Sequence, residues 1–374
     1  MHLFKRIEFK NIDIYLILLM SALIGIGILA ISSATSYSGD TSVLKSQITF
    51  FIFGLILMTI IMNFNYKFLG VWYLGIYTIT NLVLLAVLLF GNDAKGATRW
   101  ISIGPVQIQP SEFAKITMIL CTARLISLKN EKMNSVVTIA QIGLFQFVPF
   151  ILINRQPNLS TSIVILTLLV LQLFVSKLKM RYILGTALVG GITVAIAVGY
   201  IVSNPNQQIL DAYQRNRIVT AVMGGDSQSD NYQTSRSVDA IGSGGLNGKG
   251  LYQGAISQLN YLPESHNDFI VATIAEEFGF VGILVLLGII ILFVGRGLFL
   301  AYVIDDDFGR MILVGYFGMI AAQSFINLGV VTAVLPNTGL PLPFVSYGGS
   351  SLWANMMGMG LVLSVIGNRE ETMF

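Results

Sequence analysis

The chain has 374 residues, of which 54% are hydrophobic and only 11% are charged, and its mean hydropathy is +0.75. Soluble domains carry about 25% charged residues, so this composition excludes a soluble globular enzyme and predicts an integral membrane protein. The net charge is only +3, and the sequence has no basic patch interleaved with aromatic residues, so nucleic acid is not an expected partner.

Ten apolar segments are each close to the ~20 residues that an α-helix needs to cross a bilayer. They lie near residues 14–34, 46–64, 67–90, 112–128, 136–153, 159–176, 182–203, 268–295, 310–333 and 345–367. Irregular backbone cannot face lipid, so each is expected to be helical. The predicted fold is an all-α integral membrane protein with ten transmembrane helices, in which residues 1–374 form a single polytopic membrane domain.

The distribution of Lys and Arg predicts the orientation. If the N-terminus is cytoplasmic, more Lys and Arg residues fall in cytoplasmic connections than in outer ones, so we expect both termini inside the cell membrane. This topology places every unusual polar stretch on the extracytoplasmic side. These stretches are residues 91–111, 154–158, 334–345 and a large loop, 204–267, between the seventh and eighth helices.

The first outer stretch leads into the fourth helix. Residues 102–109 alternate around a Gly-Pro pair, which predicts a small hairpin or re-entrant turn. Pro110 then starts a helix, with Ser111 as a candidate cap. Glu112 and Lys115 are three residues apart, so they share a helix face and can pair. This spacing fits a structural ion pair as well as a substrate contact.

The large outer loop holds a glycine-rich run, GSGGLNGKG, at residues 242–250. Its spacing is not GxxxxGK[ST] and it is expected outside the cell, so we reject a nucleotide-binding loop. Four basic residues of the loop could contact phosphates of a lipid carrier, although a solvated loop with ordinary surface charges explains them better. They are Arg215, Arg217, Arg236 and Lys249.

The last outer stretch, PNTGLPLPFVSYGGSS at residues 336–351, is too rich in proline and glycine for a plain helix. Broken backbone near a membrane is tolerated where it is buried in protein or lines a wet cavity. A cavity wall is therefore expected here, with a stiff loop as the alternative.

Acidic residues follow the large loop. Asp268 is expected at the outer mouth of the eighth helix, with Glu276 and Glu277 about 12–14 Å deeper. A carboxylate in a partly dry mouth is suited to act as a general base, whereas Asn267 or Asp268 could instead be the helix cap. The deeper pair is expected to hold neighbouring helices together.

Several motifs in the same order make the chain resemble the SEDS family of bacterial cell-wall proteins, which includes RodA, FtsW and SpoVE. They stand here as RWISIGPVQIQPSEFAK, QPNLSTS, YQTSRSVDAIGSGGLNGKG, LPESHNDFI, AEEFG, QSFINLG and LPNTGLPLPFVSYGGSS. The resemblance runs from the first helix to Arg369. It implies a peptidoglycan glycosyltransferase that polymerises lipid II at the outer leaflet together with a cognate class B penicillin-binding protein. Gln156 before Pro157 favours the RodA role in elongation over an FtsW or SpoVE role in division or sporulation.

The resemblance also implies roles for individual residues. Asp268 matches the family's essential aspartate, and Glu112 and Lys115 match the acid and base of its QPSE..K motif. Ser346 and Ser350 belong to the SYGGSS motif and are expected to contact substrate. Three motifs depart from the family's usual pattern. The first departure, at Asn158, puts a charge-dependent role at that residue in doubt. Asn158 replaces an acid, Asn267 replaces a hydroxyl residue, and Arg236 stands where glutamine is usual.

In the expected mechanism, Asp268 takes the proton from the acceptor hydroxyl while cations stabilise the departing diphosphate. Lys115 is the first candidate cation, with Lys45 and Arg217 after it. A divalent cation, Mg²⁺ or Mn²⁺, held partly by the diphosphate is expected, and no organic cofactor. A single cysteine, Cys121, and two histidines exclude a Cys-based or His-rich metal cage.

Two other functions remain open. A transporter that flips lipid II without chemistry would suit ten helices, but its charges should lie near the midplane and its sequence should show repeats. A scaffold that only activates its transpeptidase partner is the third reading.

Overall fold

A computed structural model gives the fold. It describes residues 12–368 except 40, 95–96, 105, 205–214, 216–218, 220–227, 260 and 264. Arg217, one of the predicted cation sites, lies outside the described residues.

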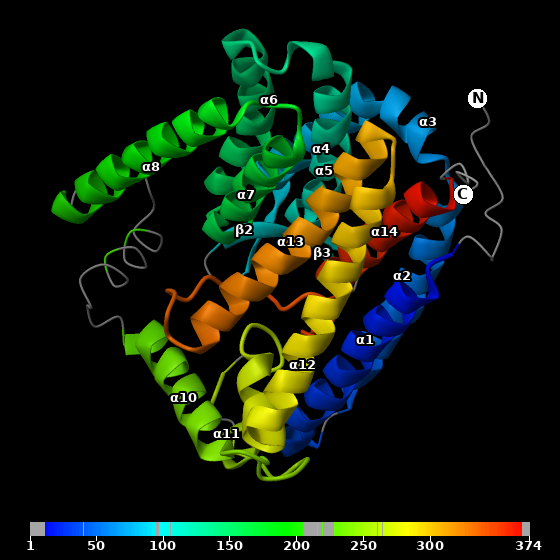
Figure 1. The fold of residues 1–374 in the computed structure, drawn as a ribbon. Helices are drawn as coiled ribbons and strands as arrows, with labels where there is room; N and C mark the ends of the chain where they lie inside the picture. The colour runs from blue at the N-terminus through cyan, green and yellow to red at the C-terminus, as the bar shows by residue number, and fades with distance from the viewer. Residues whose placement is uncertain are drawn as a thin grey trace.

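The molecule is mostly helical (Figure 1). A long helix lies at each range predicted as a membrane segment. These helices are α1 (Ile14–Ala34), α2 (Ser42–Asn63), α4 (Tyr73–Phe90), α5 (Pro110–Leu128), α6 (Val136–Arg155), α7 (Leu159–Val175), α8 (Met180–Ser203), α12 (Ile270–Val303), α13 (Asp307–Val331) and α14 (Gly349–Gly367). Shorter helices are α3 (Tyr66–Val71), α10 (Gln228–Gly244), α11 (Ala255–Gln258), η2 (Ser36–Ser38) and η3 (Asn130–Lys132).

Within the described residues, 7 helices are long and apolar enough to cross a membrane: α1, α2, α4, α6, α12, α13 and α14. The chain is therefore a multi-pass membrane protein. Of the remaining long helices, α5 carries the charged residues Glu112, Lys115 and Arg124, and α7 has only 17 residues.

Several boundaries differ from the predicted ones, each for a local reason. The third segment is divided at Trp72, which lies between α3 and α4. The eighth segment extends to Val303. Its helix, α12, is interrupted at Gly279, where φ is 63°, so part of it lies before the break and the rest after it. The tenth begins at Gly349, because the irregular Pro-rich backbone continues to Gly348.

A small antiparallel sheet, in the order β1-β2-β3, precedes α5 and adds strands to the all-α fold that was predicted. Its strands are β1 (Asn92–Ala94), β2 (Ala97–Ile103) and β3 (Val106–Ile108). The predicted hairpin is confirmed, since β2 pairs with β3 around Gly104, whose φ of 61° suits a glycine.

Contacts between helix ends mark one end of the bundle, which is called the first end below. Arg296 in α12 pairs with Asp13 before α1 at 2.6 Å, and Tyr66 of α3 donates to Asp306 before α13 at 2.9 Å. The connection between α5 and α6 is at the top of Figure 1, whereas α10 and α11 are at the bottom. The candidate site lies at the opposite, second end, where α2, α5, α7, α12 and α14 begin.

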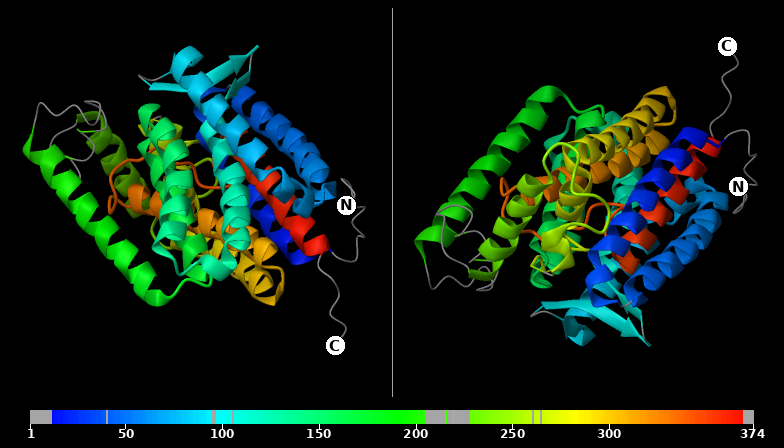
Figure 2. Two further views of the ribbon diagram at one scale, coloured as in Figure 1. Left: turned by 90° about the horizontal axis from the view of Figure 1, so that it is seen from above. Right: turned by 90° about the horizontal axis from the view of Figure 1, so that it is seen from below.

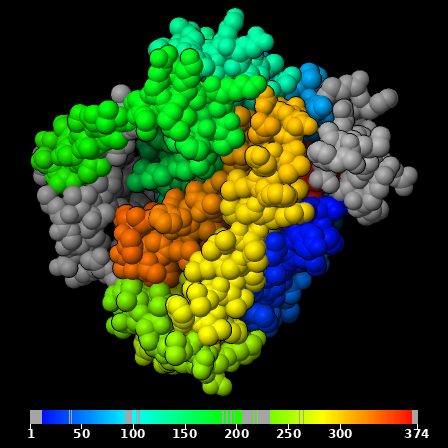
Figure 3. Space-filling model, viewed as in Figure 1, coloured from blue at the N-terminus to red at the C-terminus, as the bar shows by residue number. Residues whose placement is uncertain are grey.

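The centre of the bundle is built from α13 and α14, which are buried along most of their length. Glycines allow close packing there: a Cβ at Gly360 of α14 would lie 2.6 Å from the carbonyl oxygen of Met58 in α2. Part of α13 reaches the surface, where α1, α12 and α13 lie side by side (Figure 3). Helix α8 stands at the edge, set apart from the bundle (Figure 2).

Candidate functional site

Asp268 lies in the turn before α12, and its main chain is fixed by an asparagine from α13. The Nδ2 of Asn327 donates to the carbonyl of Asp268 at 2.8 Å and to that of Leu340 at 2.7 Å. Asn327 is only 1% exposed, so it ties this turn and the Pro-rich segment to α13 from a buried position.

The Asp268 carboxylate lies against a glycine of the Pro-rich segment. A Cβ at Gly339 would come 3.4 Å from Oδ2 of Asp268, and the φ of Gly339 is +68°. The positive φ at Gly339 favours glycine, and a methyl group there would be in van der Waals contact with the carboxylate.

The suggestion that Asn267 or Asp268 caps α12 is wrong. The N-cap residue is Phe269, whose side chain makes no cap hydrogen bond. Asp268 lies one residue before this N-cap position and is half-buried.

The Pro-rich segment is largely buried, as expected of broken backbone near a membrane. Leu340, Leu342, Phe344 and Val345 are all at most 3% exposed. The backbone N–H of Tyr347 donates to the carbonyl of His266 at 2.9 Å, which joins the segment to the turn that carries Asp268.

Tyr347 itself stays neutral at physiological pH. Burial raises the pKa of Tyr347, and a hydrogen bond with Ser46 opposes that rise. The Tyr347 ring also meets the His266 ring edge-on, with centroids 5.5 Å apart.

Ser346 and Ser350 each have a backbone partner. The Oγ of Ser346 accepts from the N–H of Leu342 at 2.8 Å, and that of Ser350 accepts from the N–H of Gln109 at 2.9 Å. Both serines are buried, and they hold the SYGGSS segment in shape and tie it to the start of α5. Their predicted contact with substrate stays a prediction.

Glu112 and Lys115 pair as the spacing predicted. The Nζ of Lys115 donates to Oε2 of Glu112 at 2.9 Å, and their side chains are 1% and 4% exposed, respectively. The pair lies in the first turns of α5, which begins at Pro110 as expected.

Ser111 is not the cap of α5, because the N-cap position is Gln109. The Ser111 hydroxyl accepts from Nδ2 of Asn158 at 3.2 Å, and Oδ1 of Asn158 accepts from the N–H of Thr161. Asn158 is thus the cap of α7, a role that an uncharged amide fills well. The Ser160 hydroxyl donates to the carbonyl of Thr338, so α5, α7 and the Pro-rich segment meet at this point.

Lys45 is exposed in the first turn of α2 and forms no ion pair with a described residue. The amide of Gln47, two residues further on, contacts the backbone of Ser346 and Gly348. Residues two apart do not share a helix face, so Lys45 points away from the SYGGSS segment. Lys45 is therefore a weaker candidate than Lys115.

Of the other loop cations, Lys249 is held by an acid: its Nζ lies 2.7 Å from Oε1 of Glu276. Arg236 forms an exposed ion pair with Asp239. Neither is directed to a phosphate site in this structure, which agrees with the expectation of ordinary loop charges.

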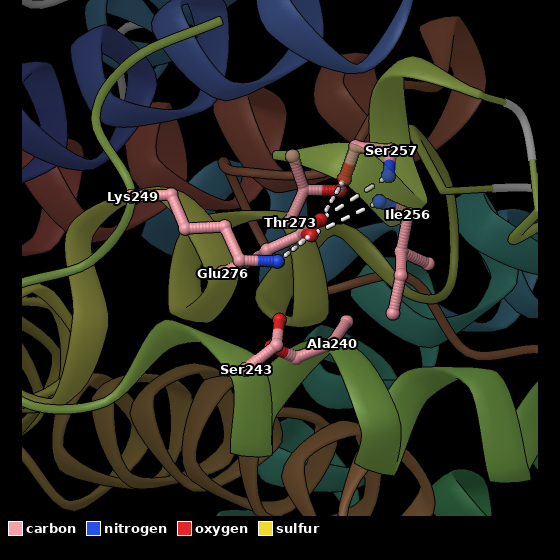
Figure 4. A network of polar contacts seen from close by, with 7 residues as sticks. All are labelled: Ala240, Ser243, Lys249, Ile256, Ser257, Thr273 and Glu276. Atoms are coloured by element: carbon pink, nitrogen blue, oxygen red, sulfur yellow. Dashed lines mark hydrogen bonds and ion pairs between the residues drawn. The ribbon is translucent and has the colours of Figure 1, made fainter. Parts of the chain in front are cut away.

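Glu276 is the centre of a buried polar network (Figure 4). Besides Lys249, its carboxylate accepts from the N–H of Ile256 at 3.0 Å and from the N–H and Oγ of Ser257 at 3.2 and 3.1 Å. The next residue, Glu277, accepts from the hydroxyl of Ser33 in α1. The expectation that these acids hold neighbouring segments together is confirmed.

The glycine-rich run makes backbone hydrogen bonds to α12 where that helix is interrupted. The sequence did not indicate this role. At Gly279 the backbone leaves helical geometry, and the carbonyls of Glu276 and Glu277 accept from the N–H groups of Lys249 and Gly250 at 3.0 and 2.9 Å. The N–H groups of residues 280 and 281 donate in turn to the carbonyls of residues 245 and 246. Residues 244–250 are called the glycine clamp below.

Within the described part of the chain, no group of three or more His, Cys, Asp or Glu side chains could hold a metal ion. Glu112 is already paired with Lys115, and Asp268 belongs to no group of three such side chains among the described residues. The side chains therefore do not fit a metal held by the protein alone.

Comparison with known proteins covers nearly the whole chain. A family model described as "Cell cycle protein", for FtsW, RodA and SpoVE, matches residues 11–371. The chain is 37% identical to the peptidoglycan glycosyltransferase MrdB of Escherichia coli K12, covering 96% of this chain and 95% of that protein. It is 34% identical to the stage V sporulation protein E of Bacillus subtilis, covering 94% and 96%.

Solved structures of related proteins also match this chain over nearly its whole length. A chain from a peptidoglycan synthase complex, described as coordinating polymerization and crosslinking, matches with a TM-score of 0.82 and 30% identity over 96% of this chain and 99% of that one. The rod shape determining protein RodA of Thermus thermophilus matches with a TM-score of 0.70 and 29% identity over 96% and 97%.

Proposed function

Because the chain belongs to the FtsW, RodA and SpoVE family and is a peptidoglycan glycosyltransferase, we propose that it polymerises lipid II at the outer face of the bacterial cell membrane. Its role is the elongation role of RodA, which its similarity to MrdB and to a rod shape determining protein supports.

The proposed topology has ten membrane crossings with both termini in the cytoplasm. The order of the long helices supports it, since α1 starts and α14 ends at the first end of the bundle, near the Asp13–Arg296 pair. The majority of Lys and Arg residues then lie on the cytoplasmic side, as the positive-inside rule requires. The second end, with Asp268, faces outward.

In the proposed reaction, Asp268 is the general base. The acceptor is the 4-hydroxyl of a GlcNAc unit, and the donor is a muramyl sugar whose C1 carries undecaprenyl diphosphate. The Asp268 carboxylate takes the hydroxyl proton as the oxygen attacks C1, and the bond from C1 to the diphosphate oxygen breaks. The half-buried carboxylate, held beside Gly339 by Asn327, is the observation that carries this assignment.

Lys115 is the proposed source of positive charge for the leaving diphosphate. Glu112 orients its ammonium at 2.9 Å, and burial of the pair strengthens its field because water does not screen it. Lys115 acts electrostatically from α5 in this conformation, since its side chain is only 1% exposed. A divalent cation held partly by the diphosphate stays part of the proposal, since Mg²⁺ needs only one or two protein carboxylates beside substrate phosphates, and no step is routed through it.

Two further features complete the proposal. An apolar groove of about 450 Å³ among α7, α12 and α13 is lined by residues such as Leu171, Leu298 and Phe325; it lies toward the cytoplasmic ends of α7 and α12, so it is proposed to take only the far ends of the long lipid tails. A class B penicillin-binding protein is the proposed partner, which the similarity to a chain of a peptidoglycan synthase complex supports.

The experiment that tests this function gives purified protein labelled lipid II in detergent, with and without the transpeptidase, and separates the products by length. Glycan chains are expected. Detergent removes the distinction between the two sides of a membrane, so a flippase yields no product. A scaffold that only activates its partner yields no glycan either, and both of these outcomes contradict the proposal.

A further inference from the structure

The large outer loop supplies a helix, α10, that packs against α12 and against the end of α13 (Figure 1). The hydroxyl of Ser237 in α10 is fully buried and donates to the carbonyl of Val331, the last residue of α13, at 2.8 Å. The Pro-rich segment follows α13 within a few residues. Helix α10 is therefore held beside the part of the chain that lies against Asp268.

Gln233 lies one turn before Ser237, on the same face of α10, and it reaches the Pro-rich segment. Its Oε1 accepts from Nδ2 of Asn337 at 3.2 Å. Asn337 is only 9% exposed and Gln233 is half-buried, so water competes little for this hydrogen bond. The bond joins the outer loop to a residue that is 104 positions further along the chain.

The other side of the Asn337 amide shapes the turn at Gly339. The Oδ1 of Asn337 accepts from the N–H of Gly339 at 3.2 Å. A side-chain oxygen that bonds to the N–H two residues on forms an Asx turn, which asparagine favours. This turn supports the conformation of Gly339, whose φ is +68°. The amide of Asn337 is planar, so the bond that Gln233 makes with its nitrogen also fixes where its oxygen points.

Gly339 carries this effect to Asp268. A Cβ at Gly339 would lie 3.4 Å from Oδ2 of Asp268, so a small movement of the turn changes the space beside the carboxylate. The carbonyls of residues 338 and 340 accept from Ser160 of α7 and Asn327 of α13. The turn is thus held by α7 and α13, and α10 adds a contact from the outer loop.

We propose that Gln233 is a positioning residue for glycosyl transfer: it holds the turn at Gly339 through Asn337 and thereby keeps the Asp268 carboxylate in place. The rate of transfer then depends on how α10 is seated. This inference rests on the proposed role of Asp268 as general base. Because Gln233 acts on the base and not on substrate binding, its loss should lower kcat and leave KM for lipid II unchanged.

The test measures initial rates of glycan synthesis over a range of lipid II concentrations, with the purified full-length protein and its class B penicillin-binding protein. Gln233→Met removes the amide and keeps the length of the side chain, whereas Gln233→Glu keeps an acceptor oxygen. Asp239→Asn is the control, since Asp239 is an exposed residue of the same helix and pairs with Arg236. Asn337→Ala, alone and combined with Gln233→Met, completes a double-mutant cycle. The Tm of each variant checks folding.

Gln233→Met should lower kcat about 5–10-fold at constant KM, because one sheltered hydrogen bond is lost and the base is displaced. Gln233→Glu and Asp239→Asn should keep the wild-type rate. Asn337→Ala should lower kcat at least as far, because it removes the Asx turn as well. In that background Gln233→Met should have no further effect, since the bond is already gone.

Amide hydrogen exchange at Gly339 tests the positioning without any chemistry. Its N–H should exchange faster in Gln233→Met and at the wild-type rate in Asp239→Asn. An inactive wild-type protein would contradict the proposed function, and exchange at Gly339 would still decide whether Gln233 holds the turn. The inference is overturned by unchanged exchange, by a wild-type kcat in Gln233→Met or by a change confined to KM. An equal loss in Gln233→Glu, or an equal effect of Gln233→Met with and without Asn337→Ala, also overturns it.

Discussion

Asn327 is a residue whose importance the structure reveals through geometry. It is buried in α13, and its one amide nitrogen serves two carbonyls on two other segments, at Asp268 and Leu340. It does not contact the carboxylate of Asp268, so it is a positioning residue.

Asn327→Leu keeps the volume of the side chain and removes both hydrogen bonds. The buried carbonyl of Leu340 and the half-buried carbonyl of Asp268 then lose their partner, at a cost of up to about 1–3 kcal/mol each, and we expect glycan synthesis to fall by ~10–100-fold as Asp268 moves. The measurement is the initial rate of lipid II polymerisation, together with Tm. The control is Asn81→Leu, which removes a bond to Tyr77 within α4 and should leave the rate unchanged.

Gly339 offers a sharper test of the space beside Asp268. Gly339→Ala places a methyl group 3.4 Å from Oδ2 of Asp268 at a residue with φ of +68°. Gly104→Ala has the same backbone cost, with φ of +61°, but nothing lies within 4 Å of its Cβ. Both variants should lose about 1 kcal/mol of stability. Only Gly339→Ala should lose most of its activity, and equal rates for the two would show that the contact with Asp268 is unimportant.

Asp268, Glu112 and Lys115 could be chosen as candidate site residues from the sequence because each stands in a motif or at a helical spacing. The contacts of Asn327 and Gly339 could not, since they join residues far apart in the chain. The predicted cap at Ser111 failed for a similar reason: its hydroxyl is used by Asn158 of another helix.

At the scale of elements, the break in α12 is stabilised by the glycine clamp. Four backbone hydrogen bonds replace those that the helix loses at Gly279, and Lys249 adds an ion pair with Glu276. The clamp fixes residues 276–281 of α12, the helix that follows Asp268.

Gly248→Ala should detach the clamp. Gly248 has φ of +77°, and a Cβ there would overlap the carbonyl of Glu277. Gly245→Ala is the matched control, because Gly245 has φ of +57° and open space around its Cβ. We expect faster amide hydrogen exchange at residues 245–250 and 280–281 in Gly248→Ala only. Similar exchange in both variants would mean that the close approach at Gly248 contributes nothing.

Lys249→Met should leave the buried Glu276 without its cation. Breaking a fully buried ion pair costs about 3–5 kcal/mol, and we expect about 2 kcal/mol here because Lys249 is 30% exposed and the other hydrogen bonds to Glu276 remain. The measurement is Tm, which should be lower in Lys249→Met. Adding Glu276→Gln should restore part of the loss, and a double variant less stable than Lys249→Met would argue against an electrostatic cause.

Helix positions and the β2–β3 hairpin could be predicted because each follows from a local pattern: apolar length, a proline at the first helical position, or alternation around a turn. The clamp could not be predicted. Its glycines fit a flexible loop equally well, and only the tertiary structure brings them against Gly279.

For the whole molecule, composition was sufficient to indicate a multi-pass membrane protein, and the order of motifs indicated the family. The arrangement of the two ends needed the structure. One end gathers Asp268, the Glu112–Lys115 pair and the SYGGSS segment around the starts of five helices. The other holds the Asp13–Arg296 pair and the hydrogen bond between Tyr66 and Asp306.

The central claim is that Asp268 removes a proton during glycan synthesis. Its most direct test is the rate of lipid II polymerisation by Asp268→Asn, which keeps the shape of the side chain, beside Asp305→Asn, which changes an exposed aspartate at the first end of the bundle. A general base contributes ~10²–10⁴-fold, so Asp268→Asn should lose at least ~100-fold in rate with Tm and partner binding unchanged, while Asp305→Asn keeps full activity. A folded Asp268→Asn protein that polymerises lipid II at the wild-type rate would contradict the account.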